Sequence, residues 1–182
     1  ANWRDIHGPG TADAAWHADH PVVHMSWNDA ACYAAWVGGR LPSEAEWEHA
    51  ARGGLGDVRF PWGDDEPDDT GYLPCNIWQG RFPQANSVAD GHAGTAPARC
   101  FEPNGFGLYN MVGNVWEWTA SGFLPYPGNT EANPYFGERF RVTRGGAWFE
   151  EATQVTTFNR NAADPDITAN DDVGFRCARN VE

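Results

Sequence analysis

The sequence contains no lysine, so its 12 basic residues are all arginines, against 25 aspartates and glutamates. Without lysine the chain has no side-chain amine for Schiff-base chemistry. The formal net charge of −13 argues against nucleic acids and anionic membranes as partners, and it favours cations or basic ligands. No apolar run approaches the ~18 residues that a membrane-spanning helix needs, so we expect no membrane partner.

Cysteine and histidine patterns typical of transition-metal sites are also scarce. No C-x-x-C spacing occurs, which argues against a zinc site, and an even number of cysteines permits two disulfides without requiring them. The four cysteines are Cys32, Cys75, Cys100 and Cys177. Cys32 falls among small residues and Cys177 in an apolar segment, so we expect both to be structural.

Three histidines, His17, His20 and His24, lie close together in the sequence. Three imidazoles can hold zinc or iron. This stretch contains a proline and has no helical period, however, so we interpret the three as structural or surface residues.

Glycine, proline and tryptophan are abundant, with 21, 13 and 10 residues. Many turns and few long regular elements are therefore expected. Two helices are predicted in the N-terminal third, within 26–39 and 41–54. Ser26 caps the first, and Ser43 with Glu46 forms a capping box for the second, which Gly53 ends. The buried sides of these helices are expected to carry aromatic residues, namely Trp27, Tyr33, Trp36 and Trp47.

After Gly53 the sequence predicts irregular segments with a few short strands, within 104–119, 139–149 and 173–179. Residues 64–69 read as a solvated acidic loop. No linker or internal repeat divides the chain. We therefore predict one domain over residues 1–182, of the α+β class and with little regular secondary structure.

Eight phrases, in order along nearly the whole chain, resemble the formylglycine-generating enzyme family, also called sulfatase-modifying factors. They are DHPVVHMSWNDA, GRLPSEAEWEHAARGGL, FPWGD, NIWQGRFP, DGHAGTAP, NGFGLYNMVGNVWEWT, RVTRGGAW and VGFRCAR. The resemblance implies a fold related to C-type lectins. It also implies that the family's N-terminal part is missing from this chain. Many relatives pair a first-helix cysteine with the position of Cys177, but Cys32 lies two residues before that helix position, which disfavours the pairing.

The resemblance implies a copper(I) site built from two cysteines soon after the Gly-Gly pair. Those positions hold Glu150 and Val155 here, and Ala147 and Asp172 replace a serine and an asparagine of the family. Copper(I) prefers soft thiolates, which a carboxylate and a valine do not supply. We therefore expect neither bound copper nor the family's oxidase activity.

The phrase NMVGNVWEW offers the kinds of oxygen that calcium prefers, and the resemblance matches it to one of the family's calcium sites. The ligands would be the side chains of Asn110 and Glu117 and the carbonyls of Gly113 and Val115. The alternative is a polar turn with a solvated Glu117.

A second calcium site is implied by the resemblance alone. Asn76 and Asp90 would supply side-chain oxygens, and Ile77 and His92 would supply carbonyls. Cys75 and Cys100 flank this loop and could pair across it. We therefore expect one or two calcium ions as cofactors.

Two further resemblances widen the functional expectations. WTASGFLPYPG is similar to ergothioneine-type sulfoxide synthases, whose iron-binding histidines come from a helical domain that this chain lacks. FNRNAADPDITANDDVGFRCAR resembles the variable proteins of diversity-generating retroelements, which use this fold to bind ligands.

The first hypothesis is a calcium-stabilised binding module for a peptide, a sugar or a small molecule. Its ligand surface would be formed by Trp116, Trp148, Phe149, Glu150, Thr153, Phe158 and Asn159. The alternative is an oxygen-dependent oxidoreductase acting on sulfur, with a metal site supplied by a missing segment or a partner chain. Glu150 and Glu151 could act as an acid/base pair, but solvated carboxylates on a surface loop are the favoured interpretation.

Overall fold

The computed structural model describes residues 1–10 and 18–180. Two helices, α1 (Trp27–Trp36) and α2 (Glu44–Arg52), precede a four-stranded sheet in the order β5–β4–β3–β6. The sheet contains β3 (Trp116–Phe123), β4 (Gly137–Arg144), β5 (Arg160–Ala163) and β6 (Val173–Phe175). The smaller elements are the hairpin strands β1 (Gly80–Arg81) and β2 (Ala85–Asn86) and the 3-10 turn η2 (Ala152–Gln154). The α+β class with little regular structure is confirmed.

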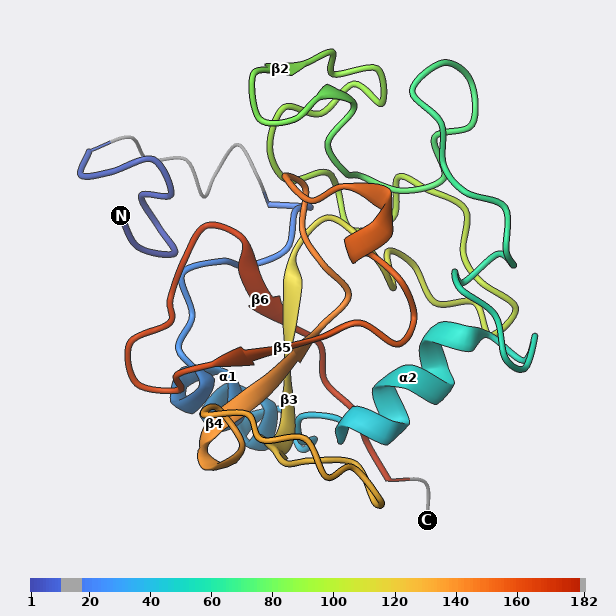
Figure 1. Cartoon of the computed structure of the whole chain (residues 1–182). Coiled ribbons are helices and arrows are strands. Elements are labelled where there is room, and N and C mark those ends of the chain that lie inside the picture. The colour runs from blue at the N-terminus through green and yellow to red at the C-terminus, as the bar shows by residue number, and fades with distance from the viewer. Residues whose placement is uncertain (11–17, 181–182) are drawn as a thin grey trace.

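Local signals fix both helices where the sequence predicts them. The Ser26 side chain accepts a hydrogen bond from the backbone N–H of Asp29 at the start of α1. Ser43 and Glu46 form the predicted reciprocal capping box on α2, and Gly53 ends it in the left-handed conformation. Both helices lie in the lower half of Figure 1, whereas the long loops between α2 and β3 fill its upper part.

Strand β3 is the centre of the sheet. It pairs antiparallel with β4, with Glu117 opposite Arg144, and parallel with β6, with Glu117 opposite Gly174. Of the predicted strand segment 104–119, only the last four residues are strand; the rest is irregular. Strand β5, which pairs with β4, was not predicted because its short sequence has no alternation of apolar and polar residues.

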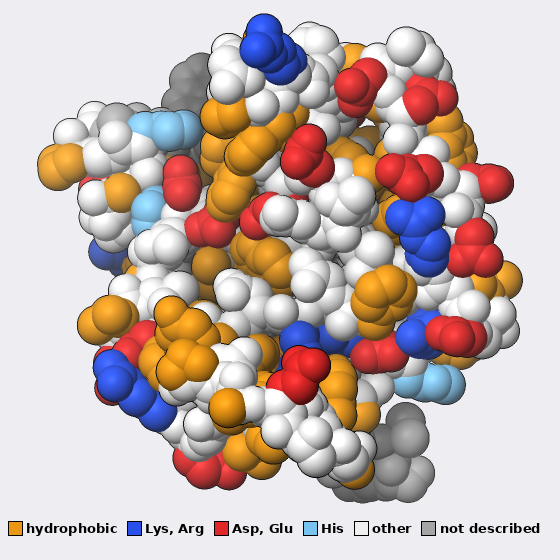
Figure 2. All heavy atoms as spheres, in the orientation of Figure 1, with side chains coloured by type: hydrophobic (Ala, Val, Ile, Leu, Met, Phe, Trp, Pro, Cys, Tyr) orange, Lys and Arg blue, Asp and Glu red, His pale blue; other side chains and the backbone are white. Residues whose placement is uncertain are grey.

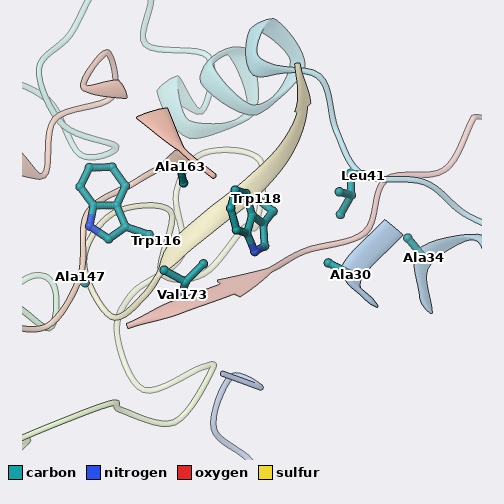
Figure 3. Close-up of a cluster of buried hydrophobic side chains, with 8 residues drawn as sticks. All are labelled: Ala30, Ala34, Leu41, Trp116, Trp118, Ala147, Ala163 and Val173. Carbon is teal, nitrogen blue, oxygen red and sulfur yellow. The ribbon is translucent and has the colours of Figure 1, made fainter. Parts of the chain in front are cut away.

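The core uses alanines on α1 where aromatic residues were expected. Ala30 and Ala34 are fully buried against β3, and Figure 3 shows them on the side of Trp118, with Ala147 beside Trp116. The expected burial of Trp36 and Tyr33 is wrong, since Trp36 is 80% exposed. Small side chains let the helix approach the sheet closely, and this turns the aromatic face outward. Trp27 packs partly buried against this cluster.

The predicted burial of Trp47 on α2 is confirmed. Trp47 forms the second core cluster together with Phe60, Met111 and Val155, among others.

Cysteine chemistry differs from the expectations. All four cysteines are free thiols, so Cys75 and Cys100 are not paired. Cys75 is buried, whereas Cys32 and Cys177 are exposed, which does not favour the structural role expected for them. Cys177 follows the end of β6, where the chain returns to the surface.

A buried ion network joins α2 to the sheet. The Arg144 guanidinium, at 0% exposure, donates to Glu48 at 2.5 Å and lies 3.5 Å from Glu44. Glu44 also pairs with Arg160 at 2.7 Å. Each carboxylate thus has a cation partner, which buried charges require.

Arg144 also closes the segment that follows it. Its two terminal nitrogens donate to the carbonyls of Thr157, Phe158 and Asn159 at 2.8 to 2.9 Å. The segment between β4 and β5 is therefore held at its base by the residue from which it departs.

None of the described helices is long and apolar enough to cross a membrane.

We expect Arg144→Met to lower the free energy of unfolding by about 3–5 kcal/mol, because it leaves buried carboxylates without their cation. Urea denaturation followed by tryptophan fluorescence would measure it. Arg139→Met is the matched control, since Arg139 is 76% exposed in its ion pair and should cost about 0–1 kcal/mol. Equal losses for the two variants would contradict the role given to Arg144.

Candidate ligand-binding and cation sites

Two glycines turn the chain out of β4 toward the predicted ligand surface. Gly145 and Gly146 both have positive φ, of 99° and 76°. A Cβ on Gly146 would lie 2.5 Å from Cγ1 of Val155, so this close approach also requires glycine. The turn that follows is closed by a hydrogen bond from the N–H of Glu150 to the carbonyl of Ala147 at 3.0 Å.

Glu150 is half-buried against the indole of Trp116, whose Nε1 donates to Oε1 of Glu150 at 3.3 Å. Burial raises the pKa of the Glu150 carboxyl above its ordinary value. The Trp116 hydrogen bond opposes that shift, and repulsion from Asp172 and Glu151 adds to it. The favoured interpretation as a solvated carboxylate is therefore wrong for Glu150, whereas Glu151 is exposed as expected.

Asp172, the residue before β6, contacts the same tryptophan through its backbone. Asp172 is only 9% exposed, and its backbone carbonyl accepts a hydrogen bond from the backbone N–H of Trp116 at 2.7 Å. Burial raises the pKa of Asp172 as well. The positions of a family thiol and a family asparagine thus hold two poorly solvated carboxylates that repel each other.

The predicted ligand surface is divided among three places. The rings of Trp148 and Phe149 meet edge to face at 5.3 Å, and Phe149 packs against the core that contains Trp116. Trp116 is only 5% exposed, so it supports Glu150 from below and is not part of the surface. Trp148 also lines a cavity of about 300 Å³.

Three other predicted residues lie away from this group. Thr153 lines a separate pocket of about 220 Å³, together with Trp78 and Glu151. Phe158 faces a shallow pocket beside α2. The Asn159 side chain donates to the carbonyl of Gln154, within the same segment.

The second copper-cysteine position belongs to the core. Val155 is 0% exposed and packs with Trp47, Phe60 and Met111. Val155 therefore offers no contact to a ligand at Glu150.

The first predicted cation loop runs through left-handed residues, with φ of 47° at Asn110 and 71° at Gly113. Oδ1 of Asn110 is buried and has no hydrogen-bond partner among the described residues, while its Nδ2 donates to Pro97. A buried amide oxygen without a donor favours a cation. Val115, the fourth residue of this set, lines the same cavity of about 370 Å³ as Asn110 and Glu117.

Glu117 is 6% exposed, so the alternative of a solvated Glu117 is wrong. It accepts from Nε1 of Trp47 at 2.6 Å and from Nε and Nη2 of Arg176, each at 2.5 Å. A carboxylate has about four acceptor positions, so one position remains for a further ligand. Arg176, a partner that sequence reasoning missed, thus contacts both oxygens of the predicted calcium ligand Glu117.

The second predicted cation loop has a similar unpaired oxygen. Asn76 is 1% exposed, and its Oδ1 has no partner among the described residues. Nε2 of Gln79 donates to the carbonyl of Ile77 at 2.5 Å and to Oδ2 of Asp90 at 3.1 Å. The backbone N–H of His92 donates to Oδ1 of Asp90. Gln79, which was not predicted, thus links two of the predicted ligands, Ile77 and Asp90, and calcium binding here stays a prediction.

Asn114 joins the two loops. Its Oδ1 accepts from Nδ2 of Asn76 at 3.2 Å and from the N–H of Ala96 at 2.8 Å. Its carbonyl accepts from the N–H of Trp148 at 2.9 Å. Hydrogen bonds over such sequence separations leave no pattern by which a single sequence reveals them.

Two of the three histidines, His20 and His24, make structural contacts with segments distant in the sequence. His24 places Nδ1 near the carbonyl of Ala169 and Nε2 near that of Ile6, and His20 contacts the hydroxyl of Thr95. His17 lies outside the described residues. No group of three His, Cys, Asp or Glu side chains within residues 1–10 and 18–180 is close enough to hold a metal ion.

Solved structures place this architecture in a known class. The structure of PvdO from Pseudomonas aeruginosa is similar, with a TM-score of 0.70 and 32% identity over 90% of this chain and 63% of that one. The variable protein 1 of Treponema denticola shares the fold, with a TM-score of 0.66 and 21% identity over 97% of this chain and 77% of that one. The domain has the formylglycine-generating-enzyme-like, C-type-lectin-related fold.

The family model for the sulfatase-modifying factor enzyme 1-like domain matches residues 1–181. The formylglycine-generating enzyme of Streptomyces coelicolor is 44% identical over 189 residues, which cover 100% of this chain and 59% of that protein. The inactive C-alpha-formylglycine-generating enzyme 2 of Mus musculus is 44% identical over 187 residues, covering 98% of this chain and 54% of that protein. The chain therefore belongs to the sulfatase-modifying factor family and spans little more than half the length of these relatives.

The raised pKa of Asp172 predicts a pH-dependent effect of Asp172→Asn. A carboxyl that binds its proton more tightly in the folded state contributes stability at low pH, and that stability is lost as pH rises through its folded pKa. The neutral amide avoids this loss. Asp172→Asn should therefore match the parent protein near pH 4.5 and exceed its unfolding free energy near pH 8, as measured by urea denaturation at both values. A pH-independent effect, like that expected for the exposed Glu131→Gln, would contradict the burial argument.

Proposed function

We propose that this chain is a calcium-stabilised ligand-binding module of the sulfatase-modifying factor superfamily that lacks the copper–cysteine oxidase chemistry. The observation that carries the proposal is the environment of the two copper-cysteine positions. Glu150 is a half-buried carboxylate beside Trp116, and Val155 is part of the core. Neither position offers a soft ligand to copper(I).

One of the comparisons lends support to this proposal. The mouse relative at 44% identity carries the word inactive in its name, so this family includes a member named for the loss of the activity. The likeness to the Treponema variable protein concerns the fold alone.

The site suits binding because aromatic rings, a carboxylate and a cavity lie together. Trp148 and Phe149 give partly exposed apolar surface, and Glu150 gives a polar group whose direction is fixed by the N–H of the buried Trp116. A peptide, a sugar or another small molecule would bind against Trp148 and the adjacent cavity of about 300 Å³.

Calcium would be held by Asn76, Ile77, Asp90 and His92 in one loop and by Asn110, Gly113, Val115 and Glu117 in the other. The unpaired amide oxygens of Asn76 and Asn110 support this assignment. The ion would supply positive charge to loops that have little secondary structure of their own. Asn114, through its hydrogen bonds to Asn76 and Trp148, would carry that order to the ligand surface.

Removal of calcium should therefore lower the melting temperature, because the ion binds the folded loops and not the unfolded chain. At a free calcium concentration 100-fold above Kd, the expected loss is roughly 2.7 kcal/mol for each site. Differential scanning calorimetry with calcium and with chelator would measure it, and magnesium in place of calcium is the control. An unchanged melting temperature would remove calcium from the proposal.

The absence of oxidase chemistry has its own test. Elemental analysis of the purified chain should find calcium and no stoichiometric copper or iron, and a thiol substrate should cause no oxygen uptake after copper(I) is added. Copper or iron near one per chain, together with thiol-dependent oxygen uptake, would instead establish the alternative, an oxidoreductase acting on sulfur.

A further inference from the structure

We propose that His24 is a proton-dependent link that holds residues 1–10 against the segment before β6 and so closes one side of the cavity beside Trp148. At low pH the protonated ring joins the two segments, and at higher pH the neutral ring cannot join both. The inference goes beyond the proposed function, because it concerns access to the cavity and does not depend on which ligand binds there.

The imidazole of His24 lies between two backbone carbonyl groups. Its Nε2 is 3.0 Å from the carbonyl oxygen of Ile6, and its Nδ1 is 3.2 Å from the carbonyl oxygen of Ala169. A carbonyl oxygen only accepts hydrogen bonds, so each ring nitrogen must donate. A neutral imidazole carries one N–H, whereas the imidazolium carries two. Both hydrogen bonds therefore form at the same time only when His24 is protonated.

The two carbonyls belong to segments that are far apart in the sequence. Ile6 precedes His24 by 18 residues, and Ala169 follows it by 145 residues. The Asn2 side chain accepts hydrogen bonds only from N–H groups within residues 1–10, whereas the contact of Ile6 with His24 joins this segment to the rest of the fold. In Figure 1 residues 1–10 lie at the left edge of the domain, and Figure 2 shows histidine and acidic side chains where this segment meets the body of the molecule.

The backbone at His24 explains which contact weakens first. Its φ of 57° lies in the left-handed region, which is uncommon for a residue other than glycine. Its backbone N–H donates to the carbonyl of Asn170 at 2.9 Å, and this anchor does not involve the ring. The anchor keeps Nδ1 close to Ala169, so we expect a neutral ring to retain its proton there. The contact with Ile6 is then the one that is lost.

Both of the joined segments contribute to the cavity of about 300 Å³ beside Trp148. Ile6 and His7 line it from residues 1–10, and Asp171 lines it from the segment before β6. Loss of the hydrogen bond to Ile6 would release one wall of this cavity. Trp148 lies in a different segment, between β4 and β5, and would stay in place. Deprotonation of His24 should therefore widen the access to Trp148.

The charged groups around His24 act in both directions. Burial raises the pKa of the Asp172 carboxyl, and the nearby His24 opposes part of that rise, so an ionised Asp172 favours the imidazolium. Asp5 and Asp171 are further carboxylates on the two joined segments. His7, a second imidazole on residues 1–10, would repel the imidazolium when it is itself protonated. The test must therefore separate the two histidines.

Two other charged or titratable side chains of these segments have different partners. The Arg4 guanidinium lies over the ring of Trp3, 4.3 Å from its centroid. Nδ1 of His20 contacts the hydroxyl of Thr95 at 2.9 Å. Neither of these contacts involves the ring of His24.

Hydrogen–deuterium exchange followed by mass spectrometry tests the link in the full chain. The exchange of residues 1–8 is measured between about pH 5.5 and about pH 8, where imidazole loses its charge, and is divided by the intrinsic rate at each pH. Loss of one hydrogen bond from a charged donor should raise this normalised exchange about 10- to 100-fold across the range. A normalised exchange that stays constant would overturn the inference.

His24→Asn removes the ring, and asparagine tolerates the left-handed backbone that this position requires. Residues 1–8 of this variant should exchange at the high rate at both ends of the pH range. His49→Asn, the same change at an exposed histidine on α2, should keep the pH dependence of the parent protein. A pH dependence that survives in His24→Asn would belong to another group such as His7, and the link would be wrong.

Nitrogen-15 NMR of the imidazoles gives a second test that does not rely on the folding of any variant. In the parent protein both ring nitrogens of His24 should carry protons at about pH 5.5, and Nε2 should lose its proton as the pH rises. A neutral His24 at a pH where residues 1–8 are protected would contradict the link. The proposed binding function would survive that result, because its own tests are calcium content and thiol-dependent oxygen uptake.

Discussion

The buried guanidinium of Arg144 is the interaction on which the rest of the site depends. It is the last residue of β4, and its side chain reaches forward to the carbonyls of Thr157, Phe158 and Asn159, where the chain returns toward β5. The intervening segment, which carries Glu150, is thereby closed by hydrogen bonds between its two ends. Glu48 on α2 fixes the guanidinium from the other side. Helix α2, the sheet and the segment that carries Glu150 therefore stabilise one another.

The carboxylates of this acidic chain fall into two groups with different physical roles. Glu44, Glu48 and Glu117 are paired with arginines and join elements of the fold. Glu150 and Asp172 are also withdrawn from water, yet neither forms an ion pair with an arginine of the described residues. Structural ion pairs and functional groups both perturb titration, so the perturbed carboxylates without an arginine are the better candidates for function. This separation gives a physical reason to look for function at Trp116 rather than at the more acidic loop of residues 64–69, where Asp68 is satisfied by the backbone N–H groups of its own turn.

Sequence reasoning succeeded where the determining interactions are local. The capping box of Ser43 and Glu46 lies within four residues, and a single pattern specifies it. It failed where the partner is distant in the chain. Nothing in the neighbourhood of Trp36 shows that α1 would turn its alanines inward, because that choice depends on how closely β3 approaches. The burial of Glu150 is likewise set by Trp116, more than thirty residues away, so a carboxylate in a turn was taken for a solvated one.

The cation loops and the ligand turn meet at one residue. Asn114 accepts from Asn76 with its side chain and from Trp148 with its carbonyl, and its own left-handed conformation, with φ of 66°, directs both groups. Asn76, whose amide oxygen is unpaired, is hydrogen-bonded to Asn114, and Asn110, whose amide oxygen is also unpaired, lies four residues before Asn114 in the chain. Asn114 in turn positions the backbone of Trp148. Loops without ladders of backbone hydrogen bonds need some other source of order. In this domain the side-chain amide of Asn114 supplies part of that order, through its hydrogen bonds with Asn76 and Ala96.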